Sequence, residues 1–502
     1  MLSTSEGFEY TPTQGSKAGL PTQAVISPSI LDADPSILYD VIIIGAGYTG
    51  LTAARDLTAK GRSVLLLEAR DRIGGRTWTT LTAEGDRVDL GGAYVHWHQP
   101  FVWSEIVRYG LKDQIKDAYE QYEGSIQSCI IIDGVRKDFD LPDMDVWLDG
   151  ALQTFYNADG AHASELVPFP HTALHDLETA KKYDSLGVAD RLDQVRGTVS
   201  QEARRAVELI STLMSGPPAR TASYYDLLQR WVLGGATHDA YTSHMARYKL
   251  SCGQTELAKH IFDDALNANK SLRVNDGTTA LSSTTLSYTF STPVETIDYT
   301  NPSEGRVQTT DGRVFRARQI ICTIPLTVLK DVAFVPTLPE GKTRAFKEAR
   351  ANNTQKAWMQ AEGKQWRTWA ALRQEGDVAT MVSGDAHSAS PDNHTTNLVY
   401  FSGGTMSHMS PKEVVEDVQS LHPDLKVDRM ISTDWVTDPY SRGTWSLFSP
   451  GYMTTYLAAL QESLGNLKFA SSDYCDGWRG FIDGAIEAGM LVAREVDRDL
   501  ES

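Results

Sequence analysis

The stretch that decides the fold is Asp40-Val41-Ile42-Ile43-Ile44-Gly45-Ala46-Gly47-Tyr48-Thr49-Gly50. Its short apolar run is rich in β-branched residues, which is typical of a buried parallel strand. A helical pattern follows directly and extends from Tyr48 to about Lys60. A second apolar run over residues 63–68 predicts another buried strand, which completes a βαβ unit. The sequence therefore predicts an α/β domain built on a parallel sheet.

The glycines of this stretch match the G-x-G-x-x-G pattern of a Rossmann-like dinucleotide site. Gly45 permits a tight turn, Gly47 lets the backbone approach a pyrophosphate, and Gly50 allows close packing of the helix on the strand. The N-terminus of the helix offers free N–H groups to phosphates. Glu68 ends the second strand, where its carboxylate can accept hydrogen bonds from ribose hydroxyls and repel a 2′-phosphate. The alternative is a glycine-rich turn without a ligand; the flanking strands and the acid favour dinucleotide binding.

Two further glycine-rich turns favour FAD over a nicotinamide cofactor. Residues 68–76 (EARDRIGGR) add a second glycine pair and three arginines, and residues 89–94 (DLGGAY) add a third turn. A nicotinamide site needs only the first turn. A longer cofactor, with its pyrophosphate and ribityl chain lying across several loops, needs more close backbone approaches and an arginine near the diphosphate. The alternative for each arginine is a position in a solvated loop.

The rest of the chain alternates between helix-rich and strand-rich stretches. Residues 1–36 are polar, and we expect an extended arm with little structure of its own. Residues 100–245 predict mostly helices and loops, and from Pro293 the pattern changes to strands, with a hairpin turn at Asp311-Gly312. Further strands are predicted over residues 355–360, 397–401 and 428–434, and a helix over residues 479–500. Two domains built from discontinuous segments fit this alternation better than domains in series.

Composition excludes some classes of partner. The 502 residues carry 47 Lys and Arg against 65 Asp and Glu, a formal net charge of −18. Such an acidic surface argues against nucleic acid or an anionic membrane as the main partner. No run approaches the roughly 18 apolar residues of a membrane span, and no targeting segment stands at the N-terminus. We expect a soluble intracellular protein, cytoplasmic or peroxisomal, although the chain does not end in a peroxisomal tripeptide.

Cysteine and histidine spacing predicts no metal site and no disulfide framework. His96 and His98 are close neighbours, but the sequence shows no third ligand beside them. The cysteines lie far apart, which fits a reducing compartment. They are Cys129, Cys252, Cys322 and Cys475.

At the glycine-rich blocks the chain resembles the flavin-containing amine oxidase family. The similar segments extend over nearly the whole chain: residues 40–57, 65–79, 89–98, 319–329 and 477–489. The His96-Trp97-His98 block and residues 166–171 (LVPFPH) are similar to those of fungal members. The resemblance implies the fold, the cofactor and the reaction class, and it is less specific for the substrate.

The resemblance implies a Rossmann-like FAD-binding domain of the GR2 amine-oxidase type, interleaved with an α+β substrate domain. We expect the FAD-binding domain over residues 37–99, 246–335 and 440–502, the substrate domain over 100–245 and 336–439, and the arm over 1–36. It also implies a homodimer. Membrane-bound relatives attach FAD through a cysteine at the position of Thr444, which cannot form a thioether, so we expect noncovalent FAD.

The resemblance also implies catalytic and substrate-pocket residues. Trp445 and Phe481 match two rings that stand on the flavin face as an aromatic cage, and Lys356 matches a lysine near flavin N5 that acts in the oxygen reaction. Without the resemblance, the first two are ordinary core aromatics and the third is a surface lysine. Asn352 and Ala246, with the two cage residues, match positions of the substrate pocket.

Motifs and resemblance together predict one cofactor site. The resemblance places adenine near Pro293-Val294 and points the N-terminus of the last helix at the flavin. The predicted residues are Gly45, Gly47, Tyr48, Thr49, Gly50, Glu68, Ala69, Arg70, Gly75, Arg76, Gly91, Gly92, Ala93, Tyr94, Pro293, Val294, Ser472, Asp473, Phe481, Ile482 and Ala485.

The leading functional prediction is FAD-dependent oxidation of aliphatic or benzylic primary monoamines. A hydride equivalent passes from the α-carbon to flavin N5, and the resulting imine hydrolyses to aldehyde and ammonia while O2 becomes hydrogen peroxide. The alternatives on the same fold are a polyamine oxidase and an L-amino-acid oxidase. A third is a non-catalytic escort protein, which has no need for Trp445, Phe481 and Lys356 together.

Overall fold

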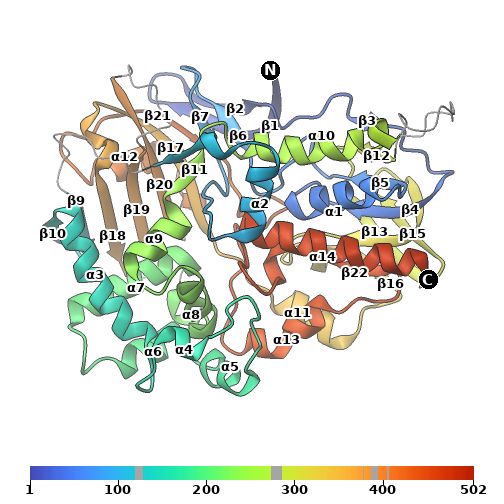
Figure 1. The fold of residues 1–502 in the computed structure, drawn as a ribbon. Coiled ribbons are helices and arrows are strands. Elements are labelled where there is room, and N and C mark those ends of the chain that lie inside the picture. The colour runs from blue at the N-terminus through green and yellow to red at the C-terminus, as the bar shows by residue number, and fades with distance from the viewer. Residues whose placement is uncertain (119–127, 217, 273–284, 377, 386–393, 404–405) are drawn as a thin grey trace.

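The computed structural model describes residues 1–118, 128–216, 218–272, 285–376, 378–385, 394–403 and 406–502 (Figure 1). Within these residues the strands form two nine-stranded sheets and two small two-stranded ones. The two large sheets lie on opposite sides of the molecule, and the helices between residues 141 and 246 gather below one of them (Figure 1).

The predicted βαβ unit is present at the centre of one large sheet. Strand β4 (Leu38–Ile44) leads through the glycine turn into helix α1 (Tyr48–Ala59), and β5 (Val64–Leu67) returns parallel to β4. Residues 41–43 and 64–66 have no exposed surface, which explains the continuous apolar runs. The strand–helix–strand prediction is therefore confirmed.

The parallel part of this sheet has Rossmann order. In space β12, β5, β4, β15 and β22 follow one another, all parallel, with β4 and β5 first in the chain. An antiparallel extension and the short strand β3 complete the sheet. The bounds are β12 (Leu286–Thr289), β15 (Val314–Cys322), β22 (Leu467–Phe469), β13 (Val294–Asn301), β14 (Glu304–Thr309), β16 (Ala333–Val335) and β3 (Ile30–Leu31). The predicted fold class, a Rossmann-like α/β domain, is confirmed.

Helices cover this sheet from both ends of the chain. Helix α1 lies against α10 (Gln254–Leu272) and α14 (Ile482–Glu501), and α2 (Pro100–Arg108) packs on α14. Helix α14 begins three residues later than the sequence predicted, because Gly480 has φ +80 and Phe481 is extended. This delay leaves the N-terminus of α14 beside the functional site described below.

The second large sheet is built from segments far apart in the chain. Its spatial order is β10 (Val135–Phe139), β9 (Ser128–Ile132), β18 (Ala370–Glu375), β19 (Val378–Asp385), β20 (Thr395–Gly403), β17 (Thr354–Glu362), β21 (Val427–Ser432), β1 (Leu2–Thr11) and β2 (Gly15–Thr22). The sequence predicted β17, β20 and β21 but missed β9, β10, β18 and β19. Strand β10 is almost entirely exposed, so it carries no alternation of apolar and polar residues.

The remaining elements surround these sheets. The helices are α3 (Leu141–Tyr156), α4 (Ala163–Leu166), α5 (Leu177–Asp184), α6 (Val188–Gln194), α7 (Gln201–Ser215), α8 (Tyr224–Leu233), α9 (His238–Ala246), α11 (Glu340–Glu348), α12 (Pro411–Gln419) and α13 (Tyr452–Gln461), with the short 3₁₀ helix η6 (Ser472–Tyr474) before α14. The small strands are β6 (Thr79–Leu81), β7 (Arg87–Asp89), β8 (Ile115–Asp117) and β11 (Tyr248–Leu250). No helix among the described residues is long and apolar enough to cross a membrane.

The expectation that residues 1–36 have little structure of their own is wrong. Strands β1 and β2 form a hairpin that adds to β21 at the edge of the second sheet, and β3 pairs with β12 in the first. Most hairpin residues are polar and partly exposed, so its ordering comes from main-chain pairing with distant strands rather than from an apolar face. The two-domain boundaries expected from the sequence remain a prediction.

The hairpin also contacts the loop of the second glycine turn. The Glu6 carboxylate on β1 lies 2.5 Å from the Arg72 guanidinium and 2.8 Å from that of Arg70. Arg72 has no exposed surface, and its Nη1 also donates to the backbone oxygen of Gly75 at 2.8 Å. Glu6 therefore neutralises a buried cation that holds the glycine turn.

We predict that Glu6→Gln lowers the free energy of unfolding by roughly 2–4 kcal/mol, because it leaves the charge of Arg72 uncompensated. Glu9 on the same strand is the matched control, since its Arg429 partner is 19% exposed and Glu9 itself 29%. Glu9→Gln should cost less than about 1 kcal/mol. Urea unfolding of the three proteins measures this, and equal losses in both variants would contradict it.

Candidate active site

A cavity of about 1370 Å³ lies between the two large sheets. Its wall includes the first turn of α1 and the ends of β4 and β5 on one side, and residues of β17, β18, β19 and β20 on the other. Helices α3, α7 and α9 and the start of α14 complete the wall. The location fits the rule that ligands of open parallel sheets bind beyond the carboxyl ends of the strands.

Most of the predicted site residues line this one cavity. On its wall are Gly45, Gly47, Tyr48, Thr49, Glu68, Ala69, Arg70, Gly75, Arg76, Gly91, Gly92, Ala93, Tyr94, Pro293, Val294, Ser472, Phe481, Ile482 and Ala485 of the predicted cofactor set, together with Lys356, Trp445 and Ala246. The structure thus brings together residues from eight separate stretches of sequence.

Three predicted residues stand behind the wall instead. Gly50 lies inside α1, where a Cβ would be 1.9 Å from the oxygen of Gly45. Asp473 accepts from Arg76 Nη2 at 2.9 Å and from the Leu326 amide at 3.0 Å. Asn352 is fully buried; its side chain donates to the Met214 oxygen at 2.8 Å. The structure gives these residues supporting contacts rather than a place on the cavity surface.

The three glycine turns pack directly on one another. A Cβ on Gly75 would lie 3.2 Å from the α-carbon of Gly47, and a Cβ on Gly91 would lie 1.9 Å from the oxygen of Arg76. Gly47 is the N-cap of α1 and supplies no side-chain cap, so the first N–H groups of the helix stay free for an anion. This arrangement of bare backbone at a helix N-terminus fits a pyrophosphate.

Glu68 is fixed by the backbone of the first turn. Its Oε2 accepts from the Ala46 amide at 2.6 Å and its Oε1 from the Arg70 amide at 2.8 Å. Burial raises the pKa of Glu68, and the neighbouring Arg70 charge opposes that rise. A carboxylate has about four acceptor positions, so lone pairs remain for ribose hydroxyls.

The arginines near the turns are engaged by acids rather than solvated. Arg70 forms an ion pair with Asp438 at 2.6 Å besides its contact with Glu6, and it lies over the Tyr440 ring. Arg76 donates to Asp473 and to the oxygen of Thr444 at 2.8 Å. Both arginines line the cavity, so they present fixed positive charge to it.

Lys356 is a buried lysine that faces the cavity. It lies on β17, and its Nζ donates to the oxygen of Gly91 at 3.0 Å. Burial lowers the pKa of Lys356 to about 8, while the Asp89 carboxylate opposes the decrease. Its side chain is only slightly exposed, so the surface-lysine alternative is excluded.

Trp445 and Phe481 line the same cavity from neighbouring segments. A Cβ on Gly480 would lie 3.2 Å from the Cβ of Trp445, so the two segments touch beside the rings. The indole Nε1 of Trp445 donates to the oxygen of Met214 at 3.0 Å, and Phe481 packs edge-to-face on Trp478. The single polar group of the two rings is therefore already hydrogen-bonded.

The apolar wall around these rings was missed by sequence reasoning. It includes Ile210, Leu213 and Met214 from α7, Met245 from α9 and Phe401 from β20. These residues have the ordinary spacing of core positions and no motif. Only tertiary structure, such as the packing of α7 against the second sheet and of α9 against α3, brings them to one wall.

We predict that Gly47→Ala leaves the fold intact but weakens FAD binding at least tenfold, about 1.4 kcal/mol. The new Cβ meets only Gly75 at 3.9 Å within the protein, yet it occupies the space that a pyrophosphate approaches. Gly150→Ala in α3 is the control, since its Cβ meets nothing within 4 Å. Fluorescence titration of the apoproteins measures both affinities, and unchanged FAD binding in Gly47→Ala would contradict the site.

Comparison with known proteins agrees with this geometry. The sequence model of flavin-containing amine oxidoreductases matches residues 48–497. Pseudooxynicotine dehydrogenase of a Pseudomonas species is 28% identical over 91% of this chain and 86% of its own length. The flavin-containing amine oxidase A of Sus scrofa is 24% identical over 91% and 85%.

Solved structures share the fold. Cyclohexylamine oxidase from Brevibacterium oxydans superposes with a TM-score of 0.71 at 21% identity, covering 93% of this chain and all of that one. The family expected from the sequence is confirmed, and with it a flavin cofactor. The protein belongs to the family of flavin-containing amine oxidoreductases.

Proposed function

We propose that this protein oxidises primary monoamines, aliphatic or benzylic, with noncovalent FAD and O2. The observation that carries the proposal is the cavity that joins the glycine turns to the apolar wall around Trp445 and Phe481. Bound FAD would supply the acceptor for a hydride equivalent from the amine and then pass the electrons to O2, which forms hydrogen peroxide. Aldehyde and ammonia follow from hydrolysis of the imine. The dimer remains a prediction of the resemblance.

The two cage rings would hold and orient a neutral amine. An apolar pocket disfavours the ammonium form, which lowers the pKa of the amine and increases the fraction with a free lone pair. Because the Trp445 Nε1 already donates to Met214, neither ring offers a donor that would compete for that lone pair. The ring faces also stabilise positive charge that develops on nitrogen.

Carboxylates at the cavity wall support a cationic substrate. Asp140 and Asp239 line the cavity and are both exposed to solvent. Exposed acids at the entrance of a cavity raise the local concentration of an ammonium ion, which can lose its proton deeper in the pocket. The same acids give the polyamine alternative its support, since they could bind a second ammonium group.

The L-amino-acid alternative has weaker support. An amino-acid oxidase requires a cation that binds the substrate carboxylate. Arg247, which follows α9 and lines the cavity, is a candidate for this role. Its Nη2 donates to the Asp117 carboxylate at 2.7 Å and its Nε to the same oxygen at 3.0 Å. Because Asp117 already neutralises the Arg247 guanidinium, this arginine is poorly suited to bind the carboxylate of an amino-acid substrate. An escort protein, in turn, would have no use for Lys356, Trp445 and Phe481 in one cavity.

Anaerobic reduction of the purified flavoprotein discriminates these candidates. We expect flavin absorbance to bleach with benzylamine or a simple alkylamine, but not with spermine or leucine. Bleaching by spermine alone would favour the polyamine candidate. Bleaching by pseudooxynicotine alone would indicate that this chain shares the substrate for which its Pseudomonas relative is named. A protein without flavin absorbance would support the escort candidate.

Noncovalent FAD is supported by the side chains at the two relevant positions. The Thr444 hydroxyl donates to the oxygen of Asn352 at 2.8 Å and carries no thiol. Cys475 is buried, and burial raises the pKa of its thiol well above the ordinary value, so it is unreactive. We predict that acid precipitation releases all flavin to the supernatant. Yellow colour that stays in the pellet would contradict this.

We predict that Lys356→Met slows reoxidation of reduced flavin about 10- to 100-fold and leaves its reduction by amine nearly unchanged. The protonated Nζ stabilises negative charge that develops on oxygen. Since the pKa of Lys356 is about 8, reoxidation of the wild type should slow as pH rises through 8, and the variant should lack this step.

Lys342→Met is the matched control for this experiment. Lys342 is also buried with its pKa lowered to about 8, but it lies outside the cavity and donates to backbone oxygens of Leu460 and Glu462. Stopped-flow measurement under oxygen compares the variants. Equal reoxidation rates in Lys356→Met and the wild type would exclude the assigned role.

A further inference from the structure

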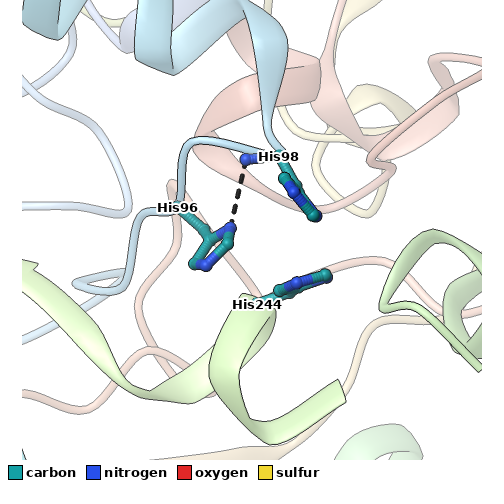
Figure 2. A group of neighbouring side chains, drawn as sticks. All are labelled: His96, His98 and His244. Atoms are coloured by element: carbon teal, nitrogen blue, oxygen red, sulfur yellow. Dashed lines mark hydrogen bonds between the residues drawn. The ribbon is translucent and has the colours of Figure 1, made fainter. Parts of the chain in front are cut away.

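Three histidine side chains meet beside α9, and none of them lines the cavity (Figure 2). His96 and His98 lie between β7 and α2, and His244 lies in the last turn of α9 (Figure 2). One ring nitrogen from each residue lies within 4.8 Å of those of the other two. The sequence suggested no metal site because His244 is far from the pair along the chain, and the fold supplies this third ligand.

We propose that His96, His98 and His244 bind a divalent transition-metal ion of the zinc or copper class. Imidazole nitrogen is a preferred ligand of these ions. A metal–nitrogen distance of about 2.1 Å places tetrahedral ligand atoms about 3.4 Å apart. The three nitrogens now lie within 4.8 Å of one another, so side-chain rotations that bring each pair closer by up to about 1.4 Å would give this separation.

One ring of the cluster also accepts a backbone hydrogen bond. In the metal-free arrangement the His98 amide donates to Nδ1 of His96 at 3.1 Å (Figure 2). A neutral imidazole offers one lone pair, so an ion bound by His96 replaces this single hydrogen bond.

Solvent reaches the cluster at His98. His98 is exposed, whereas His96 and His244 are buried. The Trp97 ring packs on His96 with centroids 3.9 Å apart, and Tyr248 lies beside both. An ion can enter at His98 and keep a water molecule as its fourth ligand, which is the usual completion of a three-histidine site. The acidic chain, with net charge −18, favours cation binding.

Metal binding would connect the loop before α2 to a helix of the cavity wall. Met245 and Ala246, directly after His244, line the cavity. An ion that binds only the folded protein stabilises it in proportion to the logarithm of ligand concentration over Kd. The proposal does not depend on the amine oxidised, because metal binding is measurable without turnover.

The test is calorimetric titration of the holoprotein with Zn²⁺, after EDTA treatment and without a polyhistidine tag. We expect one Zn²⁺ per chain with Kd of about 10 μM or tighter. His98→Ala removes the exposed ligand and His244→Gln a buried one, and each should weaken binding at least tenfold. His408→Ala, an exposed histidine elsewhere, should leave Kd unchanged.

A spectroscopic readout accompanies the titration. Cu²⁺ added to the wild type should give an electron paramagnetic resonance signal with nitrogen hyperfine splitting from imidazole, and His98→Ala should lose part of it. Flavin absorbance of each metal-free variant reports that the fold is retained. A wild-type Kd for Zn²⁺ weaker than about 10 μM would overturn the proposal. So would a Kd in His98→Ala that is less than tenfold weaker than that of the wild type.

Discussion

The side chain and backbone of Arg76 hold together parts of the site that are distant in the sequence. Its guanidinium donates to the Asp473 carboxylate at 2.9 Å and to the oxygen of Thr444 at 2.8 Å, and its own carbonyl accepts from Gly92 at 3.2 Å. The second and third glycine turns, the segment of Trp445 and the approach to α14 are therefore joined through Arg76, whose partner Asp473 is buried while its own side chain is 20% exposed. A buried carboxylate that loses its partner cation is costly, so these segments are expected to move together.

Burial disfavours the charged form of titratable groups at both ends of the cavity, so it shifts the pKa values of an acid and a base in opposite directions. It raises the pKa of Glu68 at the dinucleotide end and lowers that of Lys356 beside the third glycine turn. The exposed Asp140 and Asp239 keep ordinary access to water at the wall. A cation is thus attracted by the exposed acids and disfavoured in the buried part of the cavity, and these are the two environments that an ammonium ion meets as it becomes a neutral amine.

Local patterns in the chain were sufficient to predict the parallel core. The β4–α1–β5 unit, its glycine turn and the acid at Glu68 follow from periodicity and spacing within about thirty residues. The β1–β2 hairpin could not be predicted this way, because its order depends on β21 at the other end of the chain. Strand β10 was also missed, because almost all of its residues are exposed and its sequence therefore shows no alternation of apolar and polar side chains.

The candidate site does not divide so simply. Most motif residues line the cavity, but Gly50 does not; of the residues implied by resemblance, Trp445 and Phe481 line it, whereas Asp473 and Asn352 lie behind the wall, in contact with Arg76 and Met214. Position in an aligned segment does not determine which way a side chain points. The sequence could not place His244 beside His96 and His98, because His244 is close to these two residues in space but far from them along the chain.

A double-mutant cycle on FAD affinity tests the central claim that Arg76 and Asp473 act as one unit. The Kd for FAD is measured for the wild type, Arg76→Lys, Asp473→Asn and the double variant. The structure predicts a coupling energy above about 0.5 kcal/mol, with the double variant losing less affinity than the two single losses combined. Losses that add to within about 0.5 kcal/mol would contradict the account.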